Sequence, residues 1–289
     1  MARKMKLQLW NPRTIARLIK EGRGQGYWAD YLPWLTVRDF SSLGLSSRIR
    51  GNTTNRVHHL FSKHLELAYF YILDWSPLVA DIREQFPLLP LEETLRIAER
   101  LGVRHPMDPG ARQPIVMTTD FLIATGTGRD RRERARTTKP WDKLTPRVLE
   151  KFAIEREYFR VRGIDWGVVT ELELPRTLVA NLDILHPYHD FGRDSPLAPA
   201  LIDAVAADLT ARMARGEGSL AAAAKDCNRA FGLPPATALT VGNYLVATQQ
   251  WNIDLTVPYH PRALSVVRHV ALRSATEFRS MPLTRAESA

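Results

Sequence analysis

Residues 115–125 read Ile-Val-Met-Thr-Thr-Asp-Phe-Leu-Ile-Ala-Thr and are the strongest strand candidate in the chain. The run is rich in β-branched and apolar residues, and Pro114 and Gly126 bound it. A turn is predicted at residues 126–130, and residues 133–139 can return as a partner strand. The fold must therefore accommodate an antiparallel hairpin that carries an acid, Asp120, in the middle of its first strand.

Helices and further strands are expected around this hairpin. Ser62 is a candidate N-cap for a helix that ends near Trp75. Apolar residues at helical spacing predict two more helices, over residues 91–101 and 146–162, and strands are expected over residues 79–89 and 167–174. This alternation is typical of an α/β domain.

The chain changes character at Pro175, where we expect a domain boundary. Beyond it, Ala-rich segments predict helices, the last two around a tight break that resembles a helix-turn-helix. A short strand or wing is expected after them. The expected helices are residues 197–215, 219–231 and 236–249, and the expected strand or wing is residues 251–259.

The positive charge lies almost entirely in the first part of the chain. The formal net charge is +9, from 40 basic and 31 acidic side chains. Residues 1–170 carry 29 basic and 19 acidic side chains, whereas residues 171–289 carry 11 and 12. A basic domain beside a nearly neutral one indicates polyanion binding by the first and a different role for the second.

Two classes of protein are disfavoured by composition. Membrane proteins are disfavoured because no apolar run approaches the ~20 residues that a membrane helix needs. Disulfide-stabilised proteins are excluded because Cys227 is the single cysteine. We therefore expect a cytoplasmic globular protein.

Asp120 and a lysine are expected to meet across the hairpin. An acid is unfavourable in a buried strand, so Asp120 either faces solvent on an edge strand or serves a function. Residues equidistant from the turn of an antiparallel hairpin face each other. Lys139 should therefore lie opposite Asp120, within one or two residues of register. Such a pair is either a simple ion pair or a metal-binding carboxylate beside a lysine that orients a water.

Glu66 is the candidate for a second carboxylate. It shares a helical stripe with Phe70 and Leu73, although the helix dipole alone explains an acid in a first helical turn. Together with Asp120 it offers two carboxylates for Mg²⁺, a cation that prefers oxygen ligands and retains waters. We expect Mn²⁺ to substitute. Such an ion activates a water and stabilises charge on a phosphodiester.

Two other groups of residues have both ordinary and functional interpretations. Residues 129–136 contain five arginines, which either clamp DNA phosphates or form a solvated turn with internal ion pairs. The three histidines His58, His59 and His64 lack a good ligand spacing, and we expect them to be surface residues.

Four segments resemble the TnsA endonucleases of cut-and-paste transposons: SKHLELAYFYILDWSPLVADIREQFPLLP, VMTTDFLI, TTKPWDKLTPRVLEKFAIEREYF and IDWGVVTELELP. They occur in order between about residues 50 and 190. The order of an acid on a helix, an acid on a strand and a lysine on the next strand also matches the PD-(D/E)xK arrangement.

The resemblance implies a restriction-endonuclease-like α/β domain with a mixed-sheet core at residues 1–174. A mostly helical, winged-helix or helix-turn-helix-like domain would follow at residues 175–289. Glu66, Asp120 and Lys139 would fall on the catalytic positions of the family, with Glu155 as a supporting acid.

The resemblance also implies partners. The substrate would be double-stranded DNA at the transposon ends, where the chain would cut the 5′ ends. A TnsB-type DDE transposase would cut and join the 3′ ends. A TnsC-type AAA+ ATPase would regulate both and would contact the C-terminal domain.

Two positions depart from the family pattern. Thr137 stands where the family typically has glutamine, and Thr119 replaces the proline of the wider superfamily motif. The first departure leaves open a DNA- and protein-binding assembly factor whose nuclease site has decayed. A stand-alone restriction or repair nuclease of the same fold is a third interpretation.

Overall fold

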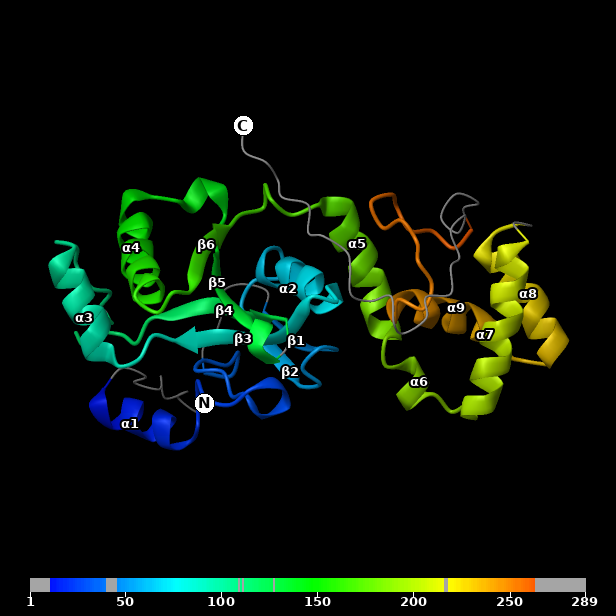
Figure 1. Cartoon of the computed structure of the whole chain (residues 1–289), viewed down its shortest axis with the longest axis horizontal. Helices are drawn as coiled ribbons and strands as arrows, with labels where there is room; N and C mark the ends of the chain where they lie inside the picture. Colours follow the sequence, from blue (N-terminus) through cyan, green and yellow to red (C-terminus); the bar gives the residue numbers. More distant parts are fainter. Residues whose placement is uncertain are drawn as a thin grey trace, which may run out of the picture. The chain divides into compact units, whose positions relative to one another are not determined.

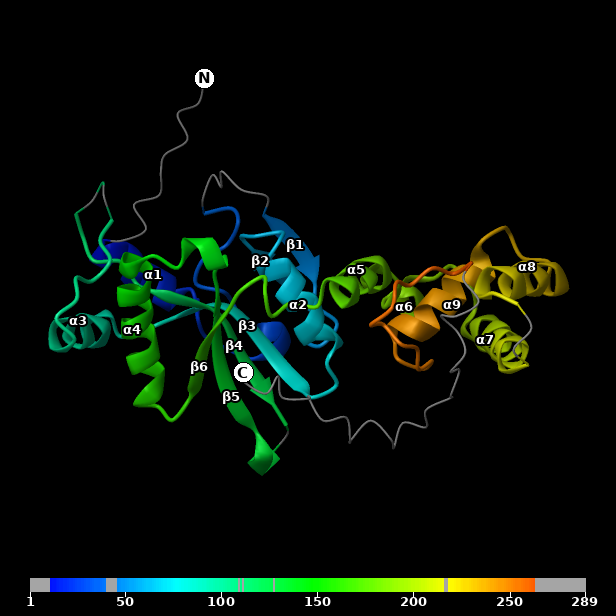
Figure 2. The same ribbon diagram turned by 90° about the horizontal axis from the view of Figure 1, so that it is seen from above.

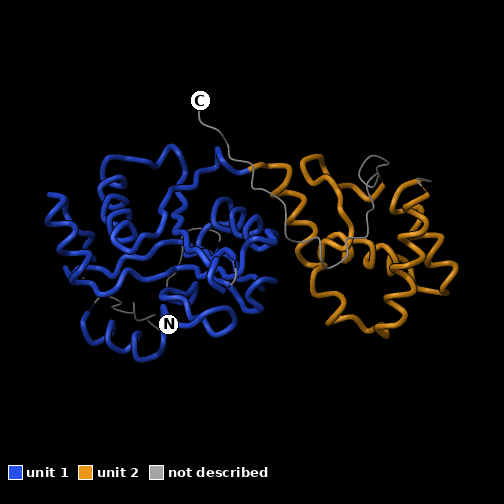
Figure 3. Tube along the Cα trace, viewed as in Figure 1, with its two compact units in different colours: residues 1–174 blue, residues 175–289 orange. Residues whose placement is uncertain are grey.

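The fold is described from a computed structural model of the chain, at residues 11–39, 46–108, 110, 112–126, 128–215 and 218–262. The chain forms two compact units, and the division lies between Leu174 and Pro175 (Figure 3). We call residues 1–174 unit 1 and residues 175–289 unit 2.

Unit 1 is built on a four-stranded mixed sheet in the order β3-β4-β5-β6 (Figure 1). The first three strands pair antiparallel, and β6 pairs parallel to β5. This arrangement confirms the predicted α/β fold with a mixed-sheet core. The strands are β3 (Val79–Pro87), β4 (Thr118–Thr125), β5 (Arg132–Thr138) and β6 (Asp165–Val169).

Helices cover both faces of this sheet. Phe121 of β4 contacts the ring of Tyr69 on α2 (Glu66–Trp75). Leu122 instead belongs to a buried cluster with residues of α3 (Leu91–Arg100) and α4 (Pro146–Arg160). Because successive strand residues point to opposite faces, α2 lies on one face and α3 and α4 lie on the other.

Most of the remaining elements of unit 1 were not predicted, and only the 3-10 turn η2 (Gly128–Asp130) falls in a predicted segment, the turn at residues 126–130. They include a small antiparallel hairpin whose two strands flank the polar loop at residues 51–55. The elements are α1 (Pro12–Lys20), the 3-10 turns η1 (Trp28–Asp30), η2 (Gly128–Asp130) and η3 (Trp141–Lys143), and the strands β1 (Ser47–Arg50) and β2 (Val57–Leu60).

Several element boundaries in unit 1 differ from the predictions, and strand β4 begins at Thr118 and not at residue 115. Helix α2 begins at Glu66, and the Ser62 hydroxyl accepts a hydrogen bond from the Leu65 N–H before the helix starts. Strand β6 ends at Val169, because Thr170 then forms a turn in which its N–H and hydroxyl donate to the Glu173 carboxylate.

Unit 2 is helical in the residues that the structure describes, which confirms the helical part of the prediction. Ser219 caps the helix α8, whose C-terminus is followed by Gly232 in a left-handed conformation, with φ 62°. The break leads into α9. The helices are α5 (Arg176–Leu185), α6 (Phe191–Asp194), α7 (Pro199–Ala214), α8 (Leu220–Phe231) and α9 (Thr237–Ala247), with a 3-10 turn η4 (His186–Tyr188).

The predicted strand or wing at residues 251–259 is wrong. The segment forms no strand ladder, and the buried side chain of Asn181 on α5 satisfies its backbone instead. The Asn181 amide donates to the carbonyls of Leu255 and Val257, at 2.8 and 2.7 Å, and accepts from the Tyr259 N–H. No described helix in either unit is long and apolar enough to cross a membrane.

Candidate active site

Asp120 lies where the β4–β5 ladder ends. The last regular pair of this ladder is Phe121 with Arg136, so Asp120 and Thr138 lie just beyond it. Asp120 Oδ2 accepts hydrogen bonds from the Thr138 N–H, at 2.7 Å, and from the Thr138 hydroxyl, at 2.8 Å. These two bonds fix the carboxylate and leave Oδ1, which has Gln85 Nε2 at 3.5 Å.

Glu66 is brought to Asp120 by the start of α2. It is the first residue of the helix and is only 7% exposed, and its Oε2 accepts a hydrogen bond from the Phe61 N–H at 2.8 Å. Burial, followed by the negative charge of Asp120, raises the pKa of Glu66 well above its ordinary value. Two carboxylates that repel each other therefore share this region of unit 1.

Lys139 lies immediately after β5, and its N–H donates to the Val169 carbonyl at 3.0 Å. Continuing the ladder by one pair places Thr137 opposite Asp120, so Lys139 lies two residues past the opposed position. Burial raises the pKa of Asp120, while the Thr138 hydrogen bonds and the charge of Lys139 lower it in part. The charge of Asp120 thus acts on Glu66 and the charge of Lys139 acts on Asp120, and the position of Lys139 lies within the register tolerance of the prediction.

A third carboxylate approaches from the opposite face of the sheet. Glu155 of α4 is buried, and its Oε2 accepts hydrogen bonds from Thr137 Oγ1, at 2.6 Å, and Trp166 Nε1, at 2.8 Å. Burial, with a contribution from the charge of Asp120, raises the pKa of Glu155 to about 8. The Glu155 carboxyl is therefore mainly protonated at neutral pH when no cation is bound.

Two residues of this site were missed by the sequence analysis. Thr138 holds Asp120, and Gln85 of β3 lies opposite Asp120 with a left-handed backbone, φ 49°. Such a conformation is uncommon for a residue with a side chain and is frequent at functional sites. Gln85 is buried, and its side chain also accepts a hydrogen bond from the Thr118 hydroxyl. The sequence could have indicated a role for Thr138, because it adjoins Lys139, but no sequence feature indicated a role for Gln85.

The site suits a magnesium ion. Among the described residues no group of three or more His, Cys, Asp or Glu side chains gathers as a ready-made metal cluster. Magnesium usually keeps several waters and is held by one or two carboxylates together with substrate phosphates. Glu66 and Asp120 are the carboxylates that could hold such an ion, since each has one oxygen fixed by a backbone N–H and the two charges repel each other.

Residues 76–171 match the family described as "TnsA-like endonuclease N terminal", and residues 173–255 match "TnsA endonuclease C terminal". The chain belongs to the TnsA endonuclease family. It is 46% identical over 173 residues to the "Transposon Tn7 transposition protein TnsA" of Escherichia coli. The alignment covers 60% of this chain and 62% of that relative.

The range matched by the N-terminal family domain includes three of the four candidate residues. Asp120, Lys139 and Glu155 lie within the range matched by the N-terminal family domain, whereas Glu66 lies before it. Thr137, one of the two positions at which the sequence departs from the expected pattern, donates its hydroxyl hydrogen to Glu155 and lies 3.0 Å from the hydroxyl of Thr119, the other such position.

Residues 129–136 were expected either to clamp DNA phosphates or to form internal ion pairs, and their arginines are of both kinds. Arg131 and Arg136 form internal ion pairs, with Asp81 and Asp165 respectively. The other three arginines, Arg129, Arg132 and Arg134, are exposed. The hairpin tip projects from unit 1 at the end of β4 and β5 that is remote from Asp120 and Lys139 (Figure 2).

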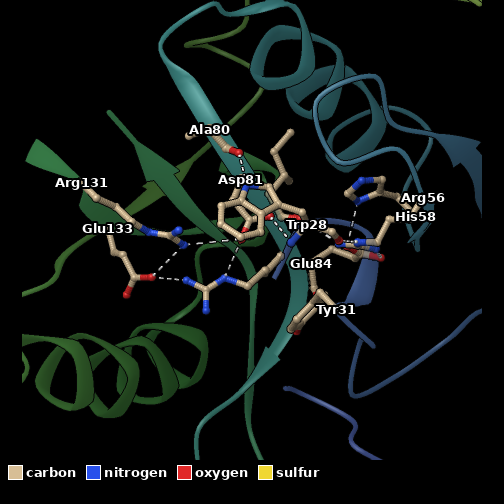
Figure 4. A network of polar contacts seen from close by, with 11 residues as sticks. Trp28, Tyr31, Arg56, His58, Ala80, Asp81, Glu84, Arg131 and Glu133 are labelled. Carbon is tan, nitrogen blue, oxygen red and sulfur yellow. Dashed lines mark hydrogen bonds and ion pairs between the residues drawn. The ribbon is translucent and has the colours of Figure 1, made fainter. Parts of the chain in front are cut away.

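A separate buried cluster surrounds Glu84 of β3 (Figure 4). Arg56 Nη1 donates to Glu84 Oε1 at 2.9 Å, and His58 Nδ1 lies 2.8 Å from Glu84 Oε2. Burial alone would raise the pKa of Glu84, but His58 and Arg56 outweigh it and hold the pKa below its ordinary value.

The prediction of surface histidines is therefore wrong for His58, which is fully buried with its Nδ1 at 2.8 Å from Glu84 Oε2. It is confirmed for His64, which is exposed, whereas His59 is half-buried.

Proposed function

We propose that this chain is a metal-dependent DNA endonuclease subunit of a heteromeric transposase. It would cut the 5′ ends of a transposon, while a DDE-type partner cuts and joins the 3′ ends. The observation that carries the proposal is the electrostatic interaction of Glu66 with Asp120 from two elements, together with the charge of Lys139, which lowers the pKa of Asp120. Membership of the TnsA family and the identity to the Tn7 transposition protein support the transposon context.

The side chains of this chain would divide the chemistry as follows. Glu66 and Asp120 would hold Mg²⁺ or Mn²⁺, which when bound supplies an activated water and neutralises charge on the phosphodiester. Thr138 and the Phe61 N–H fix the two carboxylates before substrate arrives. Lys139 would orient the attacking water or stabilise the negative charge of the pentacovalent phosphate.

Glu155 would support the site from α4. Its hydrogen bonds to Thr137 and Trp166 tie the last residues of β5 to β6 and to the helix. Its carboxyl can release a proton when a cation arrives, because the pKa of about 8 is set by burial and by the neighbouring charge of Asp120. This position is set back from Glu66, and we assign it a supporting role.

The two units would have different partners. Unit 1 carries the excess of positive charge and would bind the double-stranded DNA of the transposon ends. Unit 2 is nearly neutral, and its α8–α9 helix pair carries Lys225 and Arg229 beside Asp226. This charge pattern favours a protein contact, and a TnsC-type AAA+ ATPase is the proposed partner.

The test is Asp120→Ala in the complex assembled with the DDE-type partner on transposon-end DNA. We expect 5′-strand cutting to be abolished while 3′-strand cutting and complex assembly persist. Full 5′ cutting by the variant refutes the assignment, and absence of metal-dependent 5′ cutting by the wild-type complex identifies a decayed assembly factor. Cutting without the partner, at sites other than transposon ends, identifies a stand-alone nuclease.

A further inference from the structure

A second lysine faces the candidate site from helix α4. Arg147, Lys151 and Glu155 recur every fourth residue, so they lie on one stripe of the helix. Glu155 is anchored to Thr137 of β5 by the 2.6 Å hydrogen bond. The stripe therefore runs from Glu155, which contacts β5 at Thr137, toward the N-terminus of α4.

The charges of this stripe are only partly compensated. Arg147 forms an ion pair with Glu150, at 2.5 Å. Lys139 and Lys151 are both half-buried, and neither forms an ion pair with a carboxylate of the described residues. Burial lowers the pKa of Lys151, and the charges of Arg147 and Lys139 lower it further. The two lysines are thus close enough to repel each other.

The charge of Asp120 acts on Lys139, but Lys151 forms no ion pair among the described residues and is repelled by Lys139, which costs stability in the free protein. An anion that binds between the two lysines removes this cost. A DNA backbone phosphate is the anion that the proposed reaction brings to Lys139. A lysine is a suitable ligand for it, because its ammonium group acts as a compact point charge toward phosphate.

We infer that Lys151 binds a backbone phosphate of the strand that is cut, adjacent to the phosphodiester that Lys139 contacts. This inference rests on the proposed endonuclease function and extends it to the placement of the substrate. Lys151 acts as a positioning residue on α4, one helical turn before Glu155. It holds the cut strand in register with the carboxylates at the end of β4 and does not take part in bond cleavage.

The test measures DNA binding and cutting by the assembled complex that contains wild-type chain or Lys151→Met, which keeps an unbranched apolar stem. Binding to transposon-end DNA is measured in Ca²⁺, without cleavage, over a range of salt concentrations. We expect Lys151→Met to weaken binding about tenfold and to reduce the slope of log K against log salt by about 0.9. Lys151→Arg should restore both values.

Arg156→Met is the matched control, because Arg156 is an exposed cation on the same helix and faces away from the Lys151 stripe. If Lys151→Met and Arg156→Met have the same salt slope and the same cutting rate, the inference is overturned. If the wild-type complex binds but never cuts, the proposed function fails instead, and the salt slope still reports on Lys151.

A second measurement does not depend on the folding of the Lys151→Met variant. Methylphosphonate groups neutralise single phosphates of the cut strand near the scissile position, and wild type is compared with Lys151→Arg and Lys151→Gln. We expect one substituted position to weaken binding by wild type and by Lys151→Arg, but to have little effect on Lys151→Gln. Equal losses for all three proteins at every position contradict the inference.

Discussion

Glu66 and Glu84 are both buried carboxylates of unit 1, with 7% and 0% of their surface exposed, but their surroundings differ. Glu84 has the Arg56 guanidinium and His58 at hydrogen-bond distance, and its pKa is held low despite burial. Glu66 has a backbone N–H and the like charge of Asp120, and its pKa is raised by burial and by that charge. The negative charge of Glu84 is balanced by neighbouring basic side chains, whereas the negative charge of Glu66 is not.

This difference separates a structural from a functional use of buried charge. Removing a carboxylate from water is costly, and the cost is tolerated where a partner restores the lost interactions. Glu84 has its partners permanently, so its cluster ties β3 to the β1–β2 hairpin region. Among the described residues Glu66 forms no ion pair, and the charge of Lys139 lowers the pKa of Asp120 only in part, so the repulsion between the two acids is not cancelled.

The largest expected effect is on cutting by Glu66→Gln. Removing one of two metal ligands should remove several kcal/mol of transition-state stabilisation, or about 10³-fold in the rate of 5′-strand cutting. The metal-free variant should be at least as stable as wild type, because a repulsive buried charge has been neutralised. The rate is measured under single-turnover conditions and the stability by urea unfolding without metal. A variant that is inactive because it unfolds contradicts this interpretation.

The Glu84→Gln variant, unlike Glu66→Gln, should be less stable than wild type. Breaking a buried ion pair by removing one partner costs about 3–5 kcal/mol, because Arg56 is left buried without its counter-charge. Urea unfolding measures this loss. The control is Asp226→Asn, which removes an exposed pair with Arg229 and should cost less than about 1 kcal/mol. If Glu84→Gln is as stable as the control, the two acids do not differ as described.

The pH dependence of stability should distinguish the two sets of acids. The pKa of Glu155 is raised to about 8, so the folded state binds its proton more tightly than the unfolded state. The free energy of unfolding of the metal-free protein should therefore fall as the pH rises from about 4.5 to 8. For Glu84, whose pKa is lowered, the contribution has the opposite sign and is lost as the pH falls below the ordinary carboxyl range.

The variant Glu155→Gln isolates the first of these contributions. At about 1.4 kcal/mol per pKa unit, it should flatten the fall above pH 4.5 by a few kcal/mol. Urea unfolding at pH 5 and pH 8 in chelator measures the change. If the stability of wild type and of Glu155→Gln rises steadily between these pH values, Glu155 is not protonated in the folded protein.

The smallest expected effect is on Thr138→Val. The substitution removes the hydroxyl that donates to Asp120 Oδ2 but keeps the backbone N–H that donates to the same atom. Loss of one hydrogen bond to a charged group should lower the cutting rate by about tenfold. Thr248→Val is the matched control, because its hydroxyl donates to a carbonyl in unit 2. Equal rates for the two variants indicate that the hydroxyl does not help to fix Asp120.

The hairpin and the position of Asp120 in it could be predicted from the sequence, because both depend on the order of residue types within a short segment. The β-branched run, the turn and the returning strand define where Asp120 lies relative to Lys139. The left-handed backbone of Gln85 was not predictable, because it follows from the packing of β3 against Asp120 and not from a glycine or proline. The role proposed for Lys151 was hidden for a similar reason, since it depends on the contact that α4 makes with β5.

Polar residues caused the clearest errors. His58 belongs to a histidine-rich segment that indicated surface, but its partner Glu84 is 26 residues away in sequence and both are buried. The expected wing failed because a single side chain, Asn181, takes the hydrogen bonds that a partner strand would have made. Long-range polar pairs of this kind leave no periodic signal in the sequence.

The most direct test of the account is the position of a bound metal. A crystal of the full chain, grown with Mn²⁺ at a concentration that supports 5′-strand cutting, gives an anomalous signal for the ion. The account predicts one strong peak between the carboxylates of Glu66 and Asp120, which disappears in Asp120→Asn. A peak elsewhere in unit 1, or an unchanged peak in the variant, would contradict it.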